Sequence, residues 1–158
     1  MFKVRYALDK DAGKIEELLY DIANLHHIGR PDVFKSAVRK YSKEELIENM
    51  KDKNQPIFVL TDEQDTVLAY TICQIKNTKN HEVLQDRTVL FIDDFCVDKE
   101  ARGEGLGQFF FKEIKEICKN EYNISNIELN VWEFNEKAIN FYEKCGFNIL
   151  KRVMEIQI

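Results

Sequence analysis

The chain has 158 residues, of which 44% are hydrophobic and 32% are charged, and its formal net charge at pH 7 is −5. This length corresponds to about one domain, with room for a full hydrophobic core. The 11 Phe and 6 Tyr exclude a disordered chain, and the small numbers of Gly and Pro exclude a collagen-like or linker-rich one. We therefore expect a single domain over residues 1–158. Its acidic balance, without a Lys/Arg cluster, argues against a nucleic-acid partner.

The four cysteines, Cys73, Cys96, Cys118 and Cys145, show no C-x-x-C spacing, and no Cys/His cluster predicts a metal site. Most of them have apolar neighbours, which is typical of free thiols in a reducing compartment. The N-terminal residues lack the apolar region of a signal peptide. All apolar runs fall far short of the ~20 residues that a membrane span needs. These features predict a cytoplasmic protein with neither a metal nor a membrane partner.

The predicted elements begin with a strand at 2–8 and a helix after Asp9 or Asp11, which Gly29 and Pro31 end. A capping box at 42–45 predicts a second helix to about residue 50. Further strands are predicted at 57–60, 67–75, 88–97 and 127–131, helices at 106–118 and 135–144, and one or two final strands at 147–158. This order predicts an α/β fold whose mixed central sheet carries helices on both faces.

Three of the six glycines, Gly103, Gly105 and Gly107, are concentrated between a predicted strand and a predicted helix. The first N–H groups of a helix have no backbone partner, so glycines in such a turn let the backbone approach a phosphate closely. The spacing G-x-G-x-G fits neither a Walker loop nor a Rossmann fingerprint. From the glycines alone, a pyrophosphate cradle and a tight turn without a ligand are both open.

Two blocks of sequence resemble the GNAT acetyltransferase superfamily. Residues 102–107, RGEGLG, match its R-x-x-G-x-G signature. Residues 135–147, NEKAINFYEKCGF, are similar to its N-x-x-A-x-x-x-Y-x-x-x-G-F helix. The blocks stand in family order and the predicted strand order matches the family, so the resemblance covers the chain and implies a GNAT fold.

The resemblance implies that acetyl-CoA binds as co-substrate between two splayed parallel strands, at 92–97 and 127–131. Its pyrophosphate would lie on backbone amides of the glycine loop, and its pantetheine arm along the strand that precedes the loop. The implied cofactor-binding residues are Phe95, Cys96, Val97, Arg102, Gly103, Glu104, Gly105, Leu106, Gly107, Gln108 and Asn135.

The resemblance also places Tyr142 at the general-acid position of the family. The alternative is packing, because Ala138, Phe141, Tyr142 and Cys145 share one helix face. Protonation of a thiolate of pKa near 8.5 by a Tyr of pKa near 10 is uphill by about 2 kcal/mol. We therefore expect Tyr142 to donate a hydrogen bond to the leaving sulfur rather than to protonate it fully.

Asp93 and Asp94 are the candidate general bases. Adjacent strand residues point to opposite faces, so we expect only one of them to face the site. In the polyamine-acetylating branch of the family, the position of Asp93 is often a Glu that is proposed as the base. Direct proton removal from an alkylammonium by an ordinary Asp is uphill by about 9 kcal/mol, so a shifted pKa or a water relay is needed. A carboxylate paired with a cation is the alternative role.

His26, His27 and Phe34 are the candidate substrate-binding residues. They lie between the first two helices, in a loop that often lines the acceptor pocket in this superfamily. Ordinary polar residues at a helix end are the alternative interpretation. A nucleophilic pair of Cys96 with a histidine is a weaker hypothesis, because nothing in the spacing requires it.

Together these residues predict an N-acetyltransferase that moves an acetyl group from acetyl-CoA directly to a primary amine. The acidic charge slightly favours a small cationic amine, such as a polyamine, over a peptide acceptor. The alternatives are a protein Nα- or Lys-acetyltransferase and a non-catalytic module that binds acyl-CoA. Longer acyl donors and a homodimer are also open.

Overall fold

The computed structural model describes all 158 residues. Its strands and α-helices are, in chain order, β1 (Lys3–Tyr6), α1 (Ala12–Gly29), α2 (Lys43–Asn49), β2 (Ile57–Thr61), β3 (Val67–Thr78), β4 (Arg87–Val97), α3 (Leu106–Tyr122), β5 (Ile127–Leu129) and α4 (Glu136–Lys144). Two short 3₁₀ turns precede α1 and α3, at Asp9–Asp11 and Lys99–Ala101.

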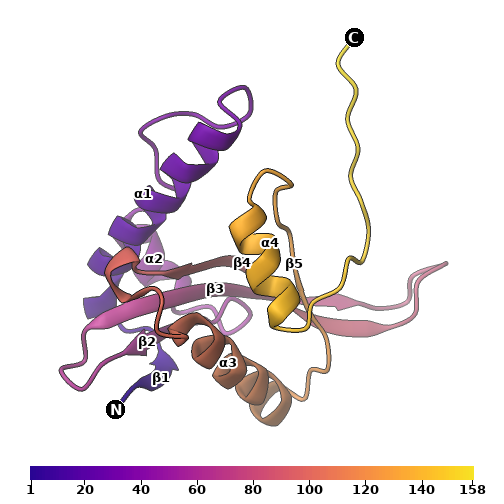
Figure 1. Cartoon of the computed structure of the whole chain (residues 1–158). Helices are drawn as coiled ribbons and strands as arrows, with labels where there is room; N and C mark the ends of the chain where they lie inside the picture. The colour runs from indigo at the N-terminus through magenta and orange to yellow at the C-terminus, as the bar shows by residue number, and fades with distance from the viewer.

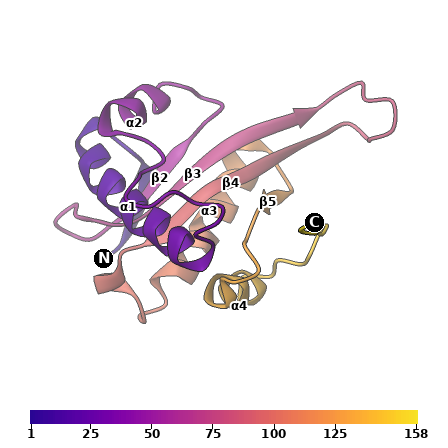
Figure 2. The same cartoon turned by 90° about the horizontal axis from the view of Figure 1, so that it is seen from above.

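The strands form one sheet in the order β1-β2-β3-β4-β5, in which only the β4–β5 pair is parallel. Helices α1 and α2 cover one face of this sheet and α3 covers the other, as Figures 1 and 2 show. All five residues of β2 are buried because both of its faces are covered. The mixed sheet with helices on both faces is therefore confirmed.

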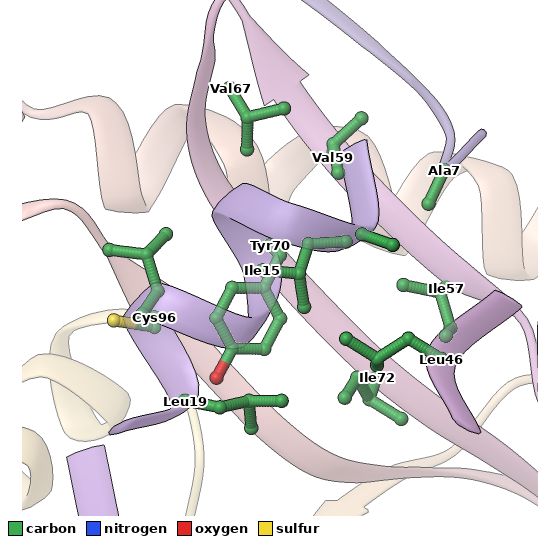
Figure 3. Close-up of a cluster of buried hydrophobic side chains, with 12 residues drawn as sticks. Ala7, Ile15, Leu19, Leu46, Ile57, Val59, Val67, Tyr70, Ile72 and Cys96 are labelled. Carbon is green, nitrogen blue, oxygen red and sulfur yellow. The ribbon is translucent and has the colours of Figure 1, made fainter. Parts of the chain in front are cut away.

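The core consists of two clusters of buried side chains, one on each side of the sheet. Ile57 and Val59 belong to the cluster under α1 and α2, whereas their neighbours Phe58 and Leu60 belong to the cluster under α3. Figure 3 shows the first cluster, with the ring of Tyr70 at its centre. Tyr70 is fully buried, and its hydroxyl has no hydrogen-bond partner.

The predicted helix ends are mostly confirmed. At the start of α2, the Ser42 hydroxyl accepts the Glu45 N–H at 3.2 Å, and the Glu45 carboxylate accepts the Ser42 N–H at 2.7 Å. Gly29 is the last residue of α1. Asp11 does not cap α1 with its side chain, because its carboxylate instead accepts hydrogen bonds from the Arg5 guanidinium at 2.6 and 3.1 Å.

The final strand predicted at 147–158 is wrong. Phe147 packs on Phe111, with 5.1 Å between the ring centroids, but the residues after it join no strand of the sheet. Figure 1 shows this segment leaving α4 and running away from the sheet as an extended chain. An alternating sequence forms a strand only where a sheet edge lies beside it, and the path out of α4 does not lead to one within this chain.

Other expectations from the sequence have mixed outcomes. The predicted strand at 127–131 ends at Leu129, where the chain turns away from β4. All four cysteines are free thiols, and Cys73, Cys96 and Cys118 are buried. None of the helices has the length and apolar character that a membrane crossing requires.

Candidate functional site

A cleft opens where the two parallel strands separate. Strands β4 and β5 pair only from Leu90 with Ile127 to Ile92 with Leu129. Beyond this point a cavity of about 1170 Å³ lies between them, lined by both strands and by α1, α3 and α4. Because β5 ends early, the backbone of β4 from Asp93 to Val97 has no strand partner on this side.

The glycine loop closes one end of the cleft. Gly103 and Gly105 have φ angles of +94° and +74°, in the left-handed region that favours glycine, and Gly105 is the N-cap of α3. A Cβ atom at either position would meet no atom within 4 Å, so the backbone here borders open space. Arg102 holds the loop in place, because its Nε donates to the Val97 carbonyl at 2.9 Å.

One close approach joins α3 to α4 beside this loop, and a side-chain cap fixes the start of α4. A Cβ atom on Gly107 would lie 3.0 Å from the ring of Phe141, so a glycine allows the start of α3 to approach α4 closely. Asn135 caps α4, with its side-chain oxygen accepting the Ala138 N–H at 3.2 Å.

The structure brings nearly all of the predicted cofactor-binding residues to the cleft. Those that line it are Phe95, Cys96, Val97, Arg102, Gly103, Gly105, Leu106, Gly107, Gln108 and Asn135. Glu104 is the exception, because it is exposed and lies outside the lining. The cleft can therefore offer backbone N–H groups at a helix start to an anion, and an unpaired strand edge to an extended ligand.

Asp93 and Asp94 lie on the same side of β4, contrary to the expectation that they point to opposite faces. The pairing register shifts between Ile72, opposite Asp94, and Cys73, opposite Ile92, which leaves Asp93 as the extra residue of a β-bulge. A bulge interrupts the strict alternation of a strand and re-aims its side chains. Both carboxylates consequently face the cleft.

Lys40, from the loop between α1 and α2, joins the two carboxylates. Its Nζ lies 2.7 Å from Asp93 Oδ2 and 3.1 Å from Asp94 Oδ2. Burial alone would lower the pKa of Lys40, but the two carboxylates outweigh it and raise this pKa. Burial raises the pKa of Asp94, and the Lys40 charge opposes that rise. Asp94 therefore binds a proton more tightly than an exposed Asp does, which makes it a stronger base.

Tyr142 borders the cleft from α4. Its ring lies edge-on to Phe95 and Phe147, with centroid distances of 6.4 and 5.5 Å. Burial, and then the nearby Asp94 carboxylate, raise the pKa of Tyr142 well above its usual range. The hydroxyl is therefore protonated at neutral pH, which suits a hydrogen-bond donor and makes full release of the proton harder still.

Aromatic side chains form the other end of the cleft. Phe34 stacks on His26 with 5.0 Å between centroids and meets Trp132 edge-on at 5.0 Å. Trp132 in turn stacks with Phe134 at 6.3 Å. This aromatic cluster joins the loop after α1 to the loop after β5, so it connects the two sides of the cleft.

Two other residues support the aromatic cluster. A Cβ atom on Gly29 would lie 2.2 Å from the ring of Phe134, so glycine at the end of α1 leaves room for that ring. His27 does not line the cleft, but its Nδ1 lies 2.7 Å from the Phe34 carbonyl oxygen and fixes the loop. Of the predicted acceptor residues, His26 and Phe34 therefore lie in the lining and His27 lies behind it.

Sequence reasoning missed Lys40 and Trp132. No local pattern marks Lys40, because its role depends on a loop folding over β4. Trp132 did carry a signal: it is the only tryptophan and it follows the carboxyl end of a parallel strand, where ligands commonly bind in α/β sheets.

The raised pKa of its thiol argues against a nucleophilic role for Cys96. Burial raises the pKa of its thiol to about 11, with the Arg102 charge opposing the rise. A thiol with this pKa is almost entirely protonated at neutral pH, and the nucleophile is the thiolate.

Comparison with known proteins supplies the family. The model described as "Acetyltransferase (GNAT) family" matches residues 19–147. Among solved structures, a tetramutant of the BH1408 protein from Bacillus halodurans superposes with a TM-score of 0.92 and 28% sequence identity, covering 99% of both chains.

Curated relatives match over shorter segments. The L-amino acid N-acetyltransferase AaaT of Escherichia coli is 37% identical over 34% of this chain and 33% of its own length. The N-alpha-acetyltransferase 50 of Danio rerio is 28% identical over 55% of this chain and 48% of its own length. The matched segments thus span less than half of either relative.

Proposed function

The chain belongs to the GNAT family of acetyltransferases, and we propose that residues 1–158 form one catalytic domain that transfers an acetyl group from acetyl-CoA directly to a primary amine. The observation that carries this proposal is the convergence of three features in one cleft. These are the glycine loop before α3, the unpaired edge of β4, and Tyr142 with the Asp93–Asp94 pair at the point where β4 and β5 separate.

The residues present fit acetyl-CoA. The first N–H groups of α3 and the open space around Gly103 and Gly105 suit a pyrophosphate, which helix N-termini attract. The edge of β4 from Phe95 to Val97 suits the amide groups of a pantetheine arm, which would add to the sheet as a strand does. Acetyl-CoA supplies the activated acetyl group.

The chemistry requires one bond to form, one to break, and two protons to leave the nitrogen. The ammonium group first loses a proton, the neutral amine forms a C–N bond to the thioester carbon, and the nitrogen loses its second proton as the C–S bond breaks. The leaving thiolate is stabilised by a hydrogen bond and takes up a proton to leave as the CoA thiol, and the other proton passes to solvent. We assign the hydrogen bond to the leaving sulfur to Tyr142, which its raised pKa keeps protonated. Asp94, directly or through water, is the favoured proton acceptor, because its pKa is raised whereas an ordinary Asp is too weak a base.

The acceptor end favours a small amine that is cationic before reaction. The two carboxylates face a single lysine, so the fully ionised cluster keeps a negative charge. Aromatic faces such as those of Phe34 and Trp132 also attract ammonium groups. A polyamine combines such a charge with an apolar stem. The alternative acceptor is a protein Nα-amine, because the Danio rerio relative is named as an N-alpha-acetyltransferase.

A panel of amines tests the proposal by release of the CoA thiol. The panel contains polyamines, free amino acids, hexosamine phosphates and peptides with free N-termini, and acetyl-CoA binding is measured in parallel by calorimetry. We expect turnover with at least one small cationic amine, above the rate of acetyl-CoA hydrolysis. Turnover confined to peptides would establish the protein acceptor, and tight acetyl-CoA binding without turnover on any amine would establish the non-catalytic module. Replacing acetyl-CoA with longer acyl donors on the best amine sets the acyl preference.

The three buried thiols fit a protein that works in a reducing compartment, such as the cytoplasm. Fractionation of the native host, followed by immunodetection, tests this placement, and recovery from an oxidising compartment would overturn it.

A further inference from the structure

Lys40 places a primary alkylammonium group against the two carboxylates of the acceptor end. The side chains of Asp93 and Asp94 are only 16% and 9% exposed, whereas that of Lys40 is 40% exposed. The carboxylates are thus fixed on β4 and largely closed off from water, and their cation reaches them from a loop on a long stem. This side chain ends in the same chemical group as the acceptor of the proposed function, on which the inference below rests.

The Asp93–Asp94 pair is arranged to bind one ammonium group. One carboxylate oxygen from each residue converges on the Lys40 nitrogen, and the backbone carbonyl oxygen of Asp93 lies 3.5 Å from it. An ammonium group has three N–H donors and no acceptor, so three oxygens around one nitrogen match it fully. A free alkylamine presents the same head group, and these oxygens therefore suit it as well as they suit Lys40.

The assigned proton acceptor requires the substrate nitrogen at this same place. A group that removes a proton must lie within hydrogen-bond distance of it, directly or through one water. The Lys40 nitrogen already lies 3.1 Å from Asp94 Oδ2. Two ammonium groups against the same oxygens would repel each other strongly, because this part of the cleft is poorly solvated. The acceptor and Lys40 consequently exclude each other.

Lys40 can leave the pair without a change in the loop that carries it. Arg39, the preceding residue, pairs with Glu16 of α1 at 2.7 Å, and Tyr41, the following residue, packs against the core cluster under α1 and α2. The Tyr41 hydroxyl also donates to Asp93 Oδ2 at 3.3 Å, a contact that does not involve Lys40. A lysine side chain is flexible, so rotation about its own bonds carries the ammonium group into water.

We propose that the ammonium group of the acceptor binds to the Asp93–Asp94 pair in the place of Lys40, so that Lys40 is a competitor within the chain that sets the affinity for cationic amines. If Lys40 occupies the pair in about nine-tenths of the molecules, the apparent Kd of such an amine is about 10-fold weaker than its intrinsic Kd. An amine with one ammonium group and no further contacts gains little over Lys40. Additional contacts, such as those of its stem with Phe34 and Trp132, then decide which amine binds.

Binding of n-butylammonium chloride to the full chain tests the displacement, because this ion is a free copy of the Lys40 side chain. The titration is followed by NMR at constant chloride concentration and without acetyl-CoA, at about pH 8.5, where an alkylammonium of pKa near 10.4 is still charged. In Lys40→Ala we expect the Kd to fall about 10-fold relative to the natural sequence. Circular dichroism checks that the variant folds, and Lys40→Met is a second variant without the charge.

Three controls separate displacement of a cation from other effects. n-Butanol has the same stem with a neutral head, so its affinity should be equal in the natural sequence and in Lys40→Ala. Lys35→Ala, on an exposed lysine of the same loop, should change the Kd of n-butylammonium by less than about threefold. Adding Asp93→Asn and Asp94→Asn to Lys40→Ala should abolish the gain in affinity.

Turnover gives a second measurement, with the best cationic amine of the panel and at a pH above the acidic limb. In Lys40→Ala, KM should fall about 10-fold and kcat should change by less than about threefold, because displacement of Lys40 weakens substrate and transition state equally. A rise in KM would overturn the proposal, because Lys40 would then assist binding of the acceptor.

Three binding results would also overturn the proposal. These are an equal Kd of n-butylammonium with and without Lys40, an equal gain for n-butanol, and a gain that survives the loss of both carboxylates. The binding experiment needs neither acetyl-CoA nor turnover, so its failure is distinct from a failure of the amine panel.

Discussion

The two ends of the cleft are built from different materials. The end near the glycine loop offers mainly backbone: the first N–H groups of α3, two glycines with positive φ and the free edge of β4. The opposite end offers side chains: the two carboxylates with Lys40, and the aromatic rings of Phe34 and Trp132. Variants at the first end should act through backbone geometry, and variants at the second through charge and contact.

Tyr142 lies between the two ends, and its hydroxyl should have the largest effect on catalysis. Tyr142→Phe removes only the hydrogen-bond donor, so we expect kcat to fall about 100-fold while acetyl-CoA affinity changes little. Steady-state kinetics and calorimetry measure the two quantities. Tyr20→Phe, on an exposed tyrosine of α1, is the control and should leave kcat unchanged. Wild-type turnover in Tyr142→Phe would remove the assignment and leave Tyr142 as a packing residue.

A single methyl group at the backbone-built end should have the next largest effect. Gly105→Ala forces a side chain onto a φ of +74°, which costs about 1–2 kcal/mol of folding free energy. Acetyl-CoA affinity should fall as well, because the start of α3 shifts. Gly13→Ala is the matched control, since Gly13 lies in α1 with open space around its Cβ position and without a positive φ. It should raise stability by about 0.4–1 kcal/mol. If chemical denaturation gave the same change in unfolding free energy for both variants, the positive φ of Gly105 would not be what requires glycine there.

The side-chain-built end should respond to pH. Lys40 opposes the rise in the pKa of Asp94, so Lys40→Met should raise that pKa further. If ionised Asp94 is needed for turnover, the rate increases as pH rises through its pKa, and the acidic limb of the kcat/KM profile should move to higher pH by about one unit. Lys35→Met, on an exposed residue of the same loop, should leave the profile in place. An unmoved limb in Lys40→Met would exclude Asp94 as the titrating group.

The same contrast explains what the sequence could predict. The glycine loop and the Asn135 cap are local features, in which residue type and spacing determine the backbone, so their positions in the cleft follow from the sequence once the fold is known. The orientation of Asp93 depends on a register shift against β3, and the position of Lys40 depends on how a loop folds over β4. Neither is encoded within a few residues, and so the sequence predicted neither of them.

The C-terminal segment, residues 147–158, shows the same limit for a whole element. Its apolar pattern is typical of a strand, which is why the sequence predicts one there, but the structure has none. A strand also needs a neighbour, and which edge is within reach depends on the direction in which α4 releases the chain. Local pattern therefore indicates what a segment prefers, whereas the partner is set by tertiary or quaternary structure.

A substitution at Tyr70 should have the smallest effect on stability. It tests the buried cluster under α1 and α2, to which Tyr70 belongs. Its ring is fully buried and its hydroxyl has no hydrogen-bond partner, although a buried polar group normally has one. Tyr70→Phe removes that hydroxyl, so stability should stay unchanged or rise by up to about 1 kcal/mol. In Tyr6→Phe, by contrast, the hydroxyl that is lost lies 2.8 Å from the Glu121 carboxylate, and stability should fall. Thermal unfolding compares the two. A clear loss of stability in Tyr70→Phe would mean that the hydroxyl bonds to a water or to Asp94 in solution, and the carboxylate end of the cleft would then extend one residue deeper.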